Sequence, residues 1–462
     1  MFAYHLPEGL PAGSRTVWSR LSLQPLSTEP LTPFSYSLLE EVAKSAWYRY
    51  FDELGFDPMP RARMVRQHEG QAYLNLTLSA QRDAEQAAVE PLTLLINKQP
   101  FPLAKWEKPG LLAAIKVGRN RKKIEQLLEN YRQQVEGVTQ KAAAWYGKTQ
   151  ELRWTQADIL QIMEEVERVS IPSFTLFLAA RHNLELLCNR LLWATQERQP
   201  FPANRALLQQ ALAAVDGAVE AQMGAQALTL VNTAAADQAT LHWLRAGQYD
   251  QWETTMPSRT LAAGVTTFLQ KYGYRALTDG EMSQPRWEEA PALLFTLLCD
   301  AVQNPPPASN AKADAEPLLA AVAPDQRKVA QQQVQQARQL LWLQSQAVHA
   351  FAYILAGTRR WALAAAKEAQ GDQRLIQADD VFFFQLEEVK QMMTGEWNIS
   401  SRQTIRNTCA ERKAAYARWQ TQAAPPVLIG DIAAQEAPAA LTTPPTGGAI
   451  AARFWEKARI IV

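Results

Sequence analysis

The sequence predicts a mainly α-helical protein, a large multi-helix body with a small β-hairpin and short strand segments. Of its 462 residues, 47% are hydrophobic and 20% are charged, which is enough apolar material for a sizeable core. From about residue 111 onward, apolar residues recur mostly at spacings of three and four, the period of a buried helix face. Clear alternation with a period of two occurs near residues 70–78.

The first helix is expected from Tyr36 to Leu54, where the apolar positions follow the helical period up to Gly55. Two apolar stripes, over 124–135 and 159–169, indicate the next two helices. The same pattern predicts further helices over 174–197, 204–232, 236–247, 325–367 and 400–420.

The strand prediction depends on the segment RMVRQHEGQAYLNLTL. Leu74, Leu76 and Leu78 alternate with polar or aromatic residues, and Glu69-Gly70 is placed to turn the chain. This segment therefore predicts a small hairpin. The segment DDVFFFQLEEVKQMM predicts a turn, a very short buried strand and another helix.

Composition divides the chain into three parts. Residues 1–35 are rich in Pro, Ser and Leu and should lie extended over the body, which spans 36–430. Within the body, 304–317 has the composition of an exposed loop. Residues 431–462 begin as a linker rich in Ala, Pro, Gly and Thr and close in ARFWEKARIIV, which resembles the opening of a strand.

Charge and cysteine usage exclude several classes of protein. The 47 Lys and Arg residues nearly cancel the 46 Asp and Glu residues, so nucleic acid and anionic membranes are not expected partners. Three widely separated cysteines fit a reducing cytoplasm, and the N-terminus lacks a signal-peptide pattern. The most apolar segment, 171–193, carries charged side chains and is expected to be a buried helix, with no membrane span.

Motifs for metals and nucleotides are missing from the sequence. The five histidines are scattered without a second ligand at metal-binding spacing, so no metal site is expected. No P-loop, dinucleotide fingerprint or nucleophile elbow occurs. The basic run VGRNRKK, 117–123, could hold a phosphate, but a solvated helix start explains it better.

The segment KYGYRALTDGEMSQPRW, 271–287, combines basic, acidic and aromatic residues around two glycines and a proline. Gly273 can end the preceding amphipathic helix and reverse the chain. Arg275 and Arg286 flank Asp279 and Glu281, and guanidinium groups hold carboxylates or phosphates through two hydrogen bonds. The loop could therefore fix itself by internal ion pairs, or present one guanidinium to an anionic ligand; the residues alone favour the first.

Tryptophans offer a second kind of candidate. Trp243, Trp252, Trp342 and Trp361 could line a pocket for a large flat or apolar ligand, although such rings are more often simply core.

Four segments in order carry a family resemblance. FLQKYGYRALTDGEMSQPRWEEAP, 268–291, resembles a segment of phosphoenolpyruvate-utilising enzymes, especially those similar to rifampicin phosphotransferase and phosphoenolpyruvate synthase. EPLTPFSYSLLEE (29–41), GQAYLNLTL (70–78) and ADDVFFFQLEEV (378–389) resemble further segments of their central helical domain. The resemblance covers about residues 25–431 in separate islands.

The resemblance implies an acceptor-binding module standing alone. In that family an ATP-grasp domain binds ATP, a swivelling domain carries a phosphorylated histidine, and the central helical domain binds the acceptor. The sequence shows neither of the first two, so no cofactor is expected in this chain; ATP and Mg would be bound by partner proteins. GGAIAARFWEKARIIV is similar to the first strand of the swivelling domain, so 431–462 is interpreted as a linker and a vestigial start of it.

Departures from the family pattern argue against catalysis by this chain. Tyr274 stands where the family has His, and the family's Arg and Lys, four apart in a long helix, fall on Gln344 and Val348 in an ungapped placement. Losing such charges strongly impairs phosphoryl transfer. No catalytic residue is therefore assigned. The resemblance implies a substrate-binding loop at the mouth of the acceptor pocket, made by Lys271, Arg275, Asp279, Glu281, Arg286 and the anchoring Trp287.

Three functions remain open at this point. The first is the acceptor-binding subunit of a split phosphotransferase, inactive without ATP-grasp and phosphohistidine proteins as partners. The second is a non-catalytic binding or scaffold protein derived from that module. The third is a helical module in a biosynthetic condensation system that uses phosphorylated intermediates.

Overall fold

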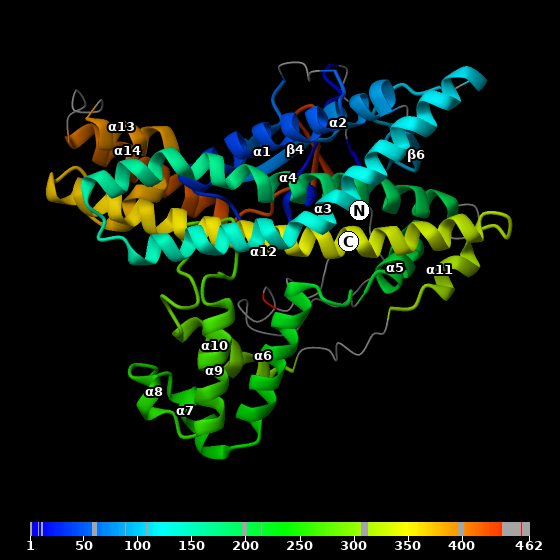
Figure 1. The fold of residues 1–462 in the computed structure, drawn as a ribbon. Helices are drawn as coiled ribbons and strands as arrows, with labels where there is room; N and C mark the ends of the chain where they lie inside the picture. Colours follow the sequence, from blue (N-terminus) through cyan, green and yellow to red (C-terminus); the bar gives the residue numbers. More distant parts are fainter. Residues whose placement is uncertain are drawn as a thin grey trace.

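The computed structural model describes residues 2–7, 9–10, 13–57, 62–87, 89–107, 110–195, 201–213, 215–305, 313–395, 402–436 and 454. The protein is mainly α-helical with one small sheet, as the sequence predicts (Figure 1). None of the helices described is long and apolar enough to cross a membrane.

Three long helices form the main body, called here the long-helix body. α12 (Arg327–Gly371) runs along α3 (Leu111–Glu151) and α4 (Gln156–Thr195), and α1 (Pro33–Glu53) packs on α4 (Figure 1). The helix predicted over 325–367 is thereby confirmed. The segments 159–169 and 174–197, which were predicted as separate helices, belong to one helix, α4, that continues through Pro172. Residues on both sides of Pro172 are buried in the same apolar core, and this packing holds the helix together across the proline.

Close packing of α3 against α12 depends on a glycine. A Cβ atom at Gly357 would lie 2.4 Å from the ring of Trp145. Any other amino acid would place a Cβ atom at this position. Glycine has none, so the Trp145 ring can pack directly on the backbone of α12.

The sheet has eight strands in the order β3-β4-β2-β7-β8-β1-β5-β6. Its strands are β1 (Ala3–His5), β2 (Val17–Ser19), β3 (Val65–His68), β4 (Gln71–Asn75), β5 (Thr93–Ile96), β6 (Gln99–Pro102), β7 (Val427–Ile429) and β8 (Ile432–Glu436). The only parallel pairing within this described sheet is β1 with β5. The hairpin β7–β8 joins a half made of β2, β3 and β4 to a half made of β1, β5 and β6.

The sheet confirms some strand predictions and corrects others. The hairpin turns at Glu69-Gly70, where both residues adopt positive φ (48° and 76°) as tight hairpin turns require. The prediction of a strand as far as Leu78 was wrong, because the Asn75 side chain accepts from the Leu78 N–H and starts α2 (Leu76–Arg82). The linker expected from residue 431 was also wrong at its start, because residues 432–436 form β8, which pairs with β7 and β1.

The remaining helices surround these elements. The range predicted as one helix, 204–232, is divided into α5 (Phe201–Ala211) and α6 (Val219–Ala235). The buried strand expected near 381–384 was wrong: η3 (Ala378–Phe383) is a 3₁₀ helix, followed by α13 (Leu386–Thr394). The other elements are the short η1 (Leu21–Leu23), π-helical η2 (Asp83–Ala87) and α11 (Glu316–Ala321), and the longer α14 (Arg402–Gln420).

Residues 219–303 form a second, smaller helical body, called here the small body. It comprises α6, α7 (Gln238–Ala246), α8 (Trp252–Thr255), α9 (Arg259–Tyr272) and α10 (Ala292–Gln303), and projects away from α12 (Figure 1). Its apolar core is separate from that of the long helices. Trp243 and Trp252 are half-buried and pack against Phe295 of this core, whereas Trp361 is fully buried in the long-helix body, so these three rings are used in packing.

Candidate functional site

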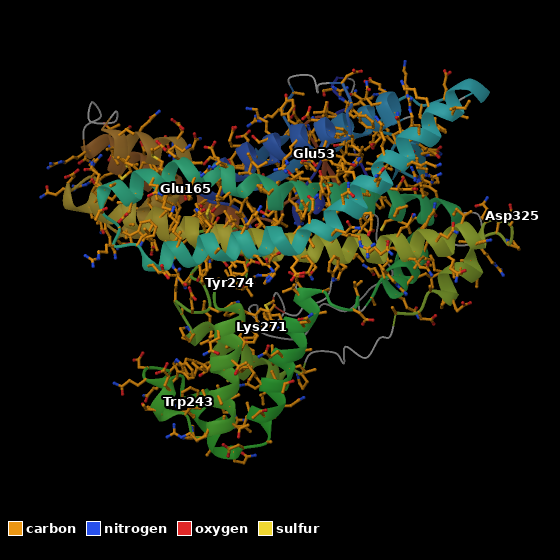
Figure 2. The ribbon with its side chains drawn as sticks, in the orientation of Figure 1. Glu53, Glu165, Trp243, Lys271, Tyr274 and Asp325 are labelled. Carbon is orange, nitrogen blue, oxygen red and sulfur yellow. The ribbon has the colours of Figure 1, made fainter. Side chains whose placement is uncertain are left out.

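The loop between α9 and α10, residues 273–291, lies where the small body meets α12; we call it the α9–α10 loop. Figure 2 shows Tyr274 at this junction and Lys271 just below it. The Trp287 N–H donates to the Arg275 carbonyl and the Glu288 N–H to the Gly273 carbonyl, each at 2.9 Å, so the two arms of the loop are bonded together. The loop is therefore an ordered structure.

Gly273 ends α9 for a different reason from the one expected. Its φ is −56°, in the right-handed helical region, so it does not reverse the chain by a left-handed conformation. A Cβ atom here would lie 2.3 Å from the Leu269 carbonyl oxygen and 3.0 Å from the Glu288 Cβ. Glycine is needed because the two arms approach so closely.

Arg275 is the centre of a buried ion cluster. Its side chain is fully buried; Nε donates to Asp279 Oδ2 at 2.9 Å, and Nη2 lies 3.0 Å from Glu220 Oε1 on α6. Burial alone would lower the pKa of Arg275, but the carboxylates of Asp279 and Glu220 raise it well above its usual value. The hydroxyl of Ser345 on α12 donates to Glu220, so this cluster connects the loop, α6 and α12.

Glu281 points the other way, to the start of α1. Its carboxylate accepts from the Thr32 N–H at 2.6 Å, from the hydroxyls of Thr32 and Ser35, and from the Ser283 N–H at 2.7 Å. Burial raises the pKa of Glu281, although these hydrogen bonds act in the opposite direction. An acceptor at the N-terminus of a helix also meets the positive end of its dipole, so Glu281 anchors the loop to α1.

Arg286 and Trp287 are buried but incompletely partnered. Arg286 Nη1 donates to the Asp279 carbonyl at 3.2 Å, while its Nε and Nη2 have no hydrogen-bond partner among the described residues. Burial lowers the pKa of Arg286 to about 10. The Trp287 ring is buried and meets the Phe454 ring edge to face, with centroids 6.1 Å apart.

Lys271 stands apart from the other five residues predicted to bind substrate. It is exposed on α9, its Nζ lies 3.4 Å from Gln222 Oε1, and it sits over the Tyr272 ring. The structure thus brings Arg275, Asp279 and Arg286 together, points Glu281 at α1, and leaves Lys271 accessible to solvent.

Two arginines of α12 that the sequence analysis did not select hold the loop from the other side. Arg359 Nε donates to Glu289 at 2.8 Å and its Nη1 to the Met282 carbonyl at 2.7 Å. Arg360 Nη2 donates to Glu288 at 2.5 Å and to the Tyr146 hydroxyl at 2.9 Å. The adjacent pairs Arg359-Arg360 and Glu288-Glu289 are complementary in sequence, which is the signal that could have found them.

Tyr274, which stands where the resemblance leads us to expect His, contacts a histidine of α12. The Tyr274 hydroxyl and His349 Nδ1 on α12 form a hydrogen bond, and the Tyr274 ring stacks on Tyr353 with centroids 3.7 Å apart. Burial, with a contribution from the Arg275 cation, lowers the pKa of His349 to about 3. The imidazole is therefore neutral near pH 7 and polar without being charged.

The two positions placed on the family's cationic pair carry no charge in the structure either. Gln344 is buried, and no described residue forms a hydrogen bond with its Oε1; Val348 is buried in the core of the long-helix body. The nearest arginines toward the C-terminus of α12, Arg359 and Arg360, are already paired with Glu289 and Glu288.

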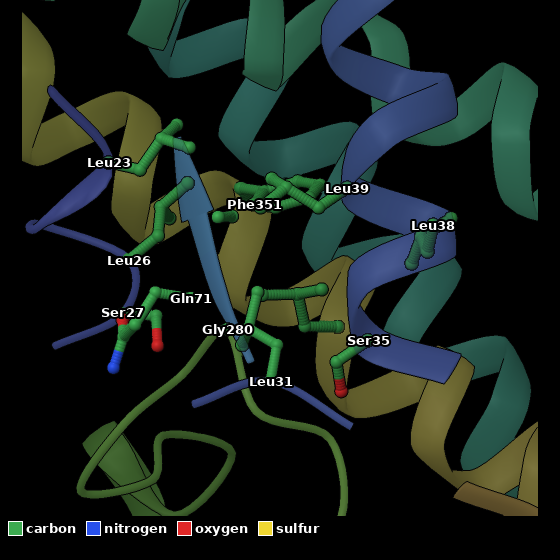
Figure 3. Close-up of a pocket in the computed structure, with 12 residues that line it drawn as sticks. Leu23, Leu26, Ser27, Leu31, Ser35, Leu38, Leu39, Gln71, Gly280 and Phe351 are labelled. Carbon is green, nitrogen blue, oxygen red and sulfur yellow. The ribbon is translucent and has the colours of Figure 1, made fainter. Parts of the chain in front are cut away.

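A small apolar hollow lies between the N-terminal segment, α1 and α12 (Figure 3). Leucines, including Leu23, Leu26, Leu31 and Leu39, line it together with Phe351, and Gly280 of the loop closes one side. It has room for about one water molecule. Among the described residues no group of His, Cys, Asp or Glu side chains is arranged to hold a metal ion.

Similarity to known proteins covers the middle of the chain. Residues 172–362 match the family model described as the rifampicin phosphotransferase fourth domain. The fourth-domain match includes the whole small body, the α9–α10 loop and α12 as far as Ala362, which confirms the resemblance to the helical domain of the phosphoenolpyruvate-utilising family. The sheet, α1 and α3 lie outside it. No curated protein matches the chain closely enough to be named beside it.

Proposed function

We propose that this chain is the acceptor-binding module of a rifampicin phosphotransferase-like system and does not transfer phosphate by itself. The observation that carries the proposal is the state of the loop: Arg275, Asp279 and Glu281 are all buried, and each is bonded to protein groups. Charges used in this way fix a binding surface but are not available to neutralise a phosphate during transfer.

The six residues predicted to bind substrate then divide into two roles. Arg275, Asp279, Glu281 and Arg286 build the junction between the two bodies, and Trp287 anchors it in the small body. Lys271 is exposed beside the junction and is the one of the six that can meet an acceptor from solvent without rearrangement. We assign it direct contact with the acceptor.

Separate polypeptides of the cytoplasm would supply the chemistry in this proposal. An ATP-grasp protein would bind ATP and Mg, and a swivelling phosphohistidine protein would carry the phosphate to an acceptor held here. Uncharged Gln344 and Val348 on α12 support this division, because the module itself offers no cationic pair at those positions.

A specific observation favours the alternative, a non-catalytic binding or scaffold protein. The hollow beside the loop holds about one water molecule, far less than an organic acceptor needs, since ligand sites usually measure several hundred Å³. In this conformation the module would bind a ligand or partner through its outer surface.

The test is to purify the tagged full chain from its own cells with whatever co-purifies, and to follow transfer of labelled phosphate from ATP. Transfer that requires an ATP-grasp and a phosphohistidine protein supports the split enzyme. ATP turnover by the pure chain alone overturns the proposal, and recovery without such proteins favours the scaffold.

Lys271→Ala gives the residue-level test in the reconstituted assay. We expect this variant to raise the acceptor concentration needed for half-maximal transfer several-fold, because a cation at the binding surface is lost. The matched control is Lys44→Ala, which removes an equally exposed lysine from α1. Equal behaviour of the two variants would remove Lys271 from the site.

A further inference from the structure

Three arginines are buried at the junction, and their guanidinium groups are used in different ways. Arg275, Arg286 and Arg359 are at most 6% exposed. A guanidinium group binds a carboxylate or a phosphate best along the edge formed by Nε and Nη2, which offers two parallel N–H groups to two oxygens. The acceptor found along this edge therefore shows what each arginine binds.

Two of the three arginines donate from Nε to a carboxylate of the protein. Asp279 Oδ2 accepts from Arg275 Nε at 2.9 Å and lies 2.8 Å from its Nη2, so one carboxylate takes both nitrogens of the edge. Glu289 Oε2 accepts from Arg359 Nε at 2.8 Å. The protein thus supplies its own anion at both positions.

Arg286 has no such partner. Its Nη1 donates to the Asp279 carbonyl at 3.2 Å, but neither Nε nor Nη2 finds an acceptor among the described residues. Burial lowers the pKa of Arg286 to about 10, so the group still carries its charge near pH 7. Buried arginines are almost always paired, and a buried N–H without a protein acceptor requires a water molecule or an ion. The unused edge of Arg286 therefore indicates a binding site.

The carboxylates around Arg286 are already in use. Three of them act on its charge: Asp279, which is bonded to Arg275, Glu289, which is bonded to Arg359, and Glu281, which accepts from the start of α1. Moving one of them to Arg286 would leave another buried group without its partner, which is unfavourable. An anion from outside the chain can occupy the edge without that loss.

We propose that Arg286 is the binding site of a compact oxyanion, a small carboxylate or free phosphate, which accepts from Nε and Nη2 and stabilises the α9–α10 loop between the two bodies. Two parallel N–H groups match the paired oxygens of an oxyanion better than a single spherical ion such as chloride. A large organic ligand does not fit, because Arg286 is 1% exposed and the hollow beside the loop has room for about one water molecule.

The enclosure of the site also determines how it acts. Since Arg286 is enclosed, the ion enters when the loop opens, and once bound it favours the closed loop. The site lies inside the junction, whereas the contact assigned to Lys271 lies on the exposed surface of α9. This inference does not rest on the acceptor-binding function.

The first experiment is urea unfolding of the full chain at pH 7 and constant ionic strength, with sodium phosphate, acetate or chloride as the added salt. Once the oxyanion exceeds its dissociation constant, the unfolding equilibrium constant should fall about tenfold for each tenfold increase in its concentration, as one site on the native state requires. Chloride should act at least tenfold more weakly. A response to phosphate or to acetate alone identifies which oxyanion is bound; no response, or equal responses to all three salts, would overturn the proposal.

A pair of variants assigns the response to Arg286. Arg286→Lys keeps the charge but replaces the two-nitrogen edge by one ammonium group, so the apparent affinity for the oxyanion should fall tenfold or more. The matched control is Arg181→Lys in α4: Arg181 is 2% exposed, but its Nε donates to Glu185 at 2.8 Å and its Nη2 to the Leu21 carbonyl at 3.0 Å. This control should leave the response to the oxyanion unchanged. If Arg286→Lys responds like the wild type, the ion binds elsewhere and the proposal is wrong.

A crystal of the wild type locates the ion without any variant. Selenate is a compact oxyanion, and its selenium is recognised by anomalous scattering. After a soak in sodium selenate, we expect a selenium peak beside Nε and Nη2 of Arg286. An anomalous map without selenium at this position would contradict the proposal, even where Arg286→Lys does not fold.

Discussion

The long-helix body and the junction at the α9–α10 loop are built on opposite principles. α3, α4 and α12 are held together by a large apolar core, whereas the junction buries Arg275, Asp279, Glu281 and Arg286, at most 1% exposed each. Apolar packing is non-directional and tolerates small repacking. Buried ion pairs add little net stability but fail sharply when one partner is removed, so they define how the two bodies sit together.

The largest expected effect comes from breaking the junction at Arg275. Arg275→Met leaves Glu220 and Asp279 buried without their cation, and removal of one partner from a buried pair typically costs about 3–5 kcal/mol. Urea unfolding, followed separately by tryptophan fluorescence and by hydrogen exchange of the small body, measures this loss.

The matched control is Arg49→Met on α1. Arg49 pairs with Glu53 at 2.7 Å, but its side chain is 45% exposed, and exposed pairs typically contribute less than about 1 kcal/mol. Similar losses for the two variants would show that burial does not distinguish the junction from the surface.

The next largest effect is expected in the long-helix body, where α3 packs against α12. Gly357→Ala places a methyl group against the Trp145 ring, and overpacking of this kind costs about 1–3 kcal/mol. Thermal unfolding by circular dichroism measures the change.

Gly147→Ala provides the control within α3. In the part of the chain that the structure describes, no atom lies within 4 Å of a Cβ at Gly147, so the substitution should stabilise the protein by about 0.5–1 kcal/mol through helix propensity. If both alanine variants stabilise the protein, the helices are not packed as closely as described.

The long-helix body and the junction each contain a histidine whose shifted pKa makes the free energy of unfolding depend on pH. Burial alone would lower the pKa of His182 in the long-helix body, but its ion pair with Asp83 at 3.0 Å raises the pKa above 6.5. Its stabilisation is therefore complete below pH 6.5 and is lost as pH rises through the raised value. His349 at the junction has its pKa lowered to about 3, so its contribution is present above pH 6.5 and is lost as pH falls.

Unfolding free energies between pH 5 and 9 separate the two regions. His349→Gln should reduce the loss of stability between pH 6.5 and 5 by about 1 kcal/mol, allowing for its partial exposure. His182→Gln should instead reduce the loss of stability that the wild type shows as pH rises above 6.5. If His349→Gln altered the change above pH 6.5 and His182→Gln the change below it, the result would contradict the electrostatic account.

The smallest effect on stability is expected at Lys271. Because it is exposed and its bond to Gln222 is long at 3.4 Å, Lys271→Ala should change the unfolding free energy by no more than about 0.5 kcal/mol. Urea unfolding beside the Arg275→Met variant measures it. A large loss would mean that Lys271 belongs to the junction and has a structural role.

The helices were predictable because their signal is local and repeated. α12 carries its apolar positions over more than ten turns, so any part of it indicates the whole. Apart from the β3–β4 hairpin, the sheet was not predictable, because its strands are three to five residues long and Val17 pairs with Ile429, more than 400 positions away in the sequence. No short pattern specifies a partner at that distance.

The candidate site, too, was predictable where its contacts are local in the sequence and not where they join distant segments. Arg275 and Asp279 are four residues apart, so their mutual pairing follows from the segment itself. Their partners Glu220 and Ser345 come from α6 and α12, and only the fold brings these residues together. The sequence therefore indicated the members of the cluster that lie in the loop, but neither Glu220 and Ser345 nor the joining of two bodies.

The order of the strands also determines when the sheet can be completed during translation. β2 ends at Ser19 and pairs with β7, which begins at Val427, 408 residues later. At about 5–20 residues per second, the ribosome needs roughly 20–80 s to make that interval. Until then one edge of β2 and one edge of β1 stay open, and open strand edges are sites of mispairing between nascent chains. The β7–β8 hairpin closes both edges at once, so β1 and β2 stay unprotected until the chain has been made as far as residue 436.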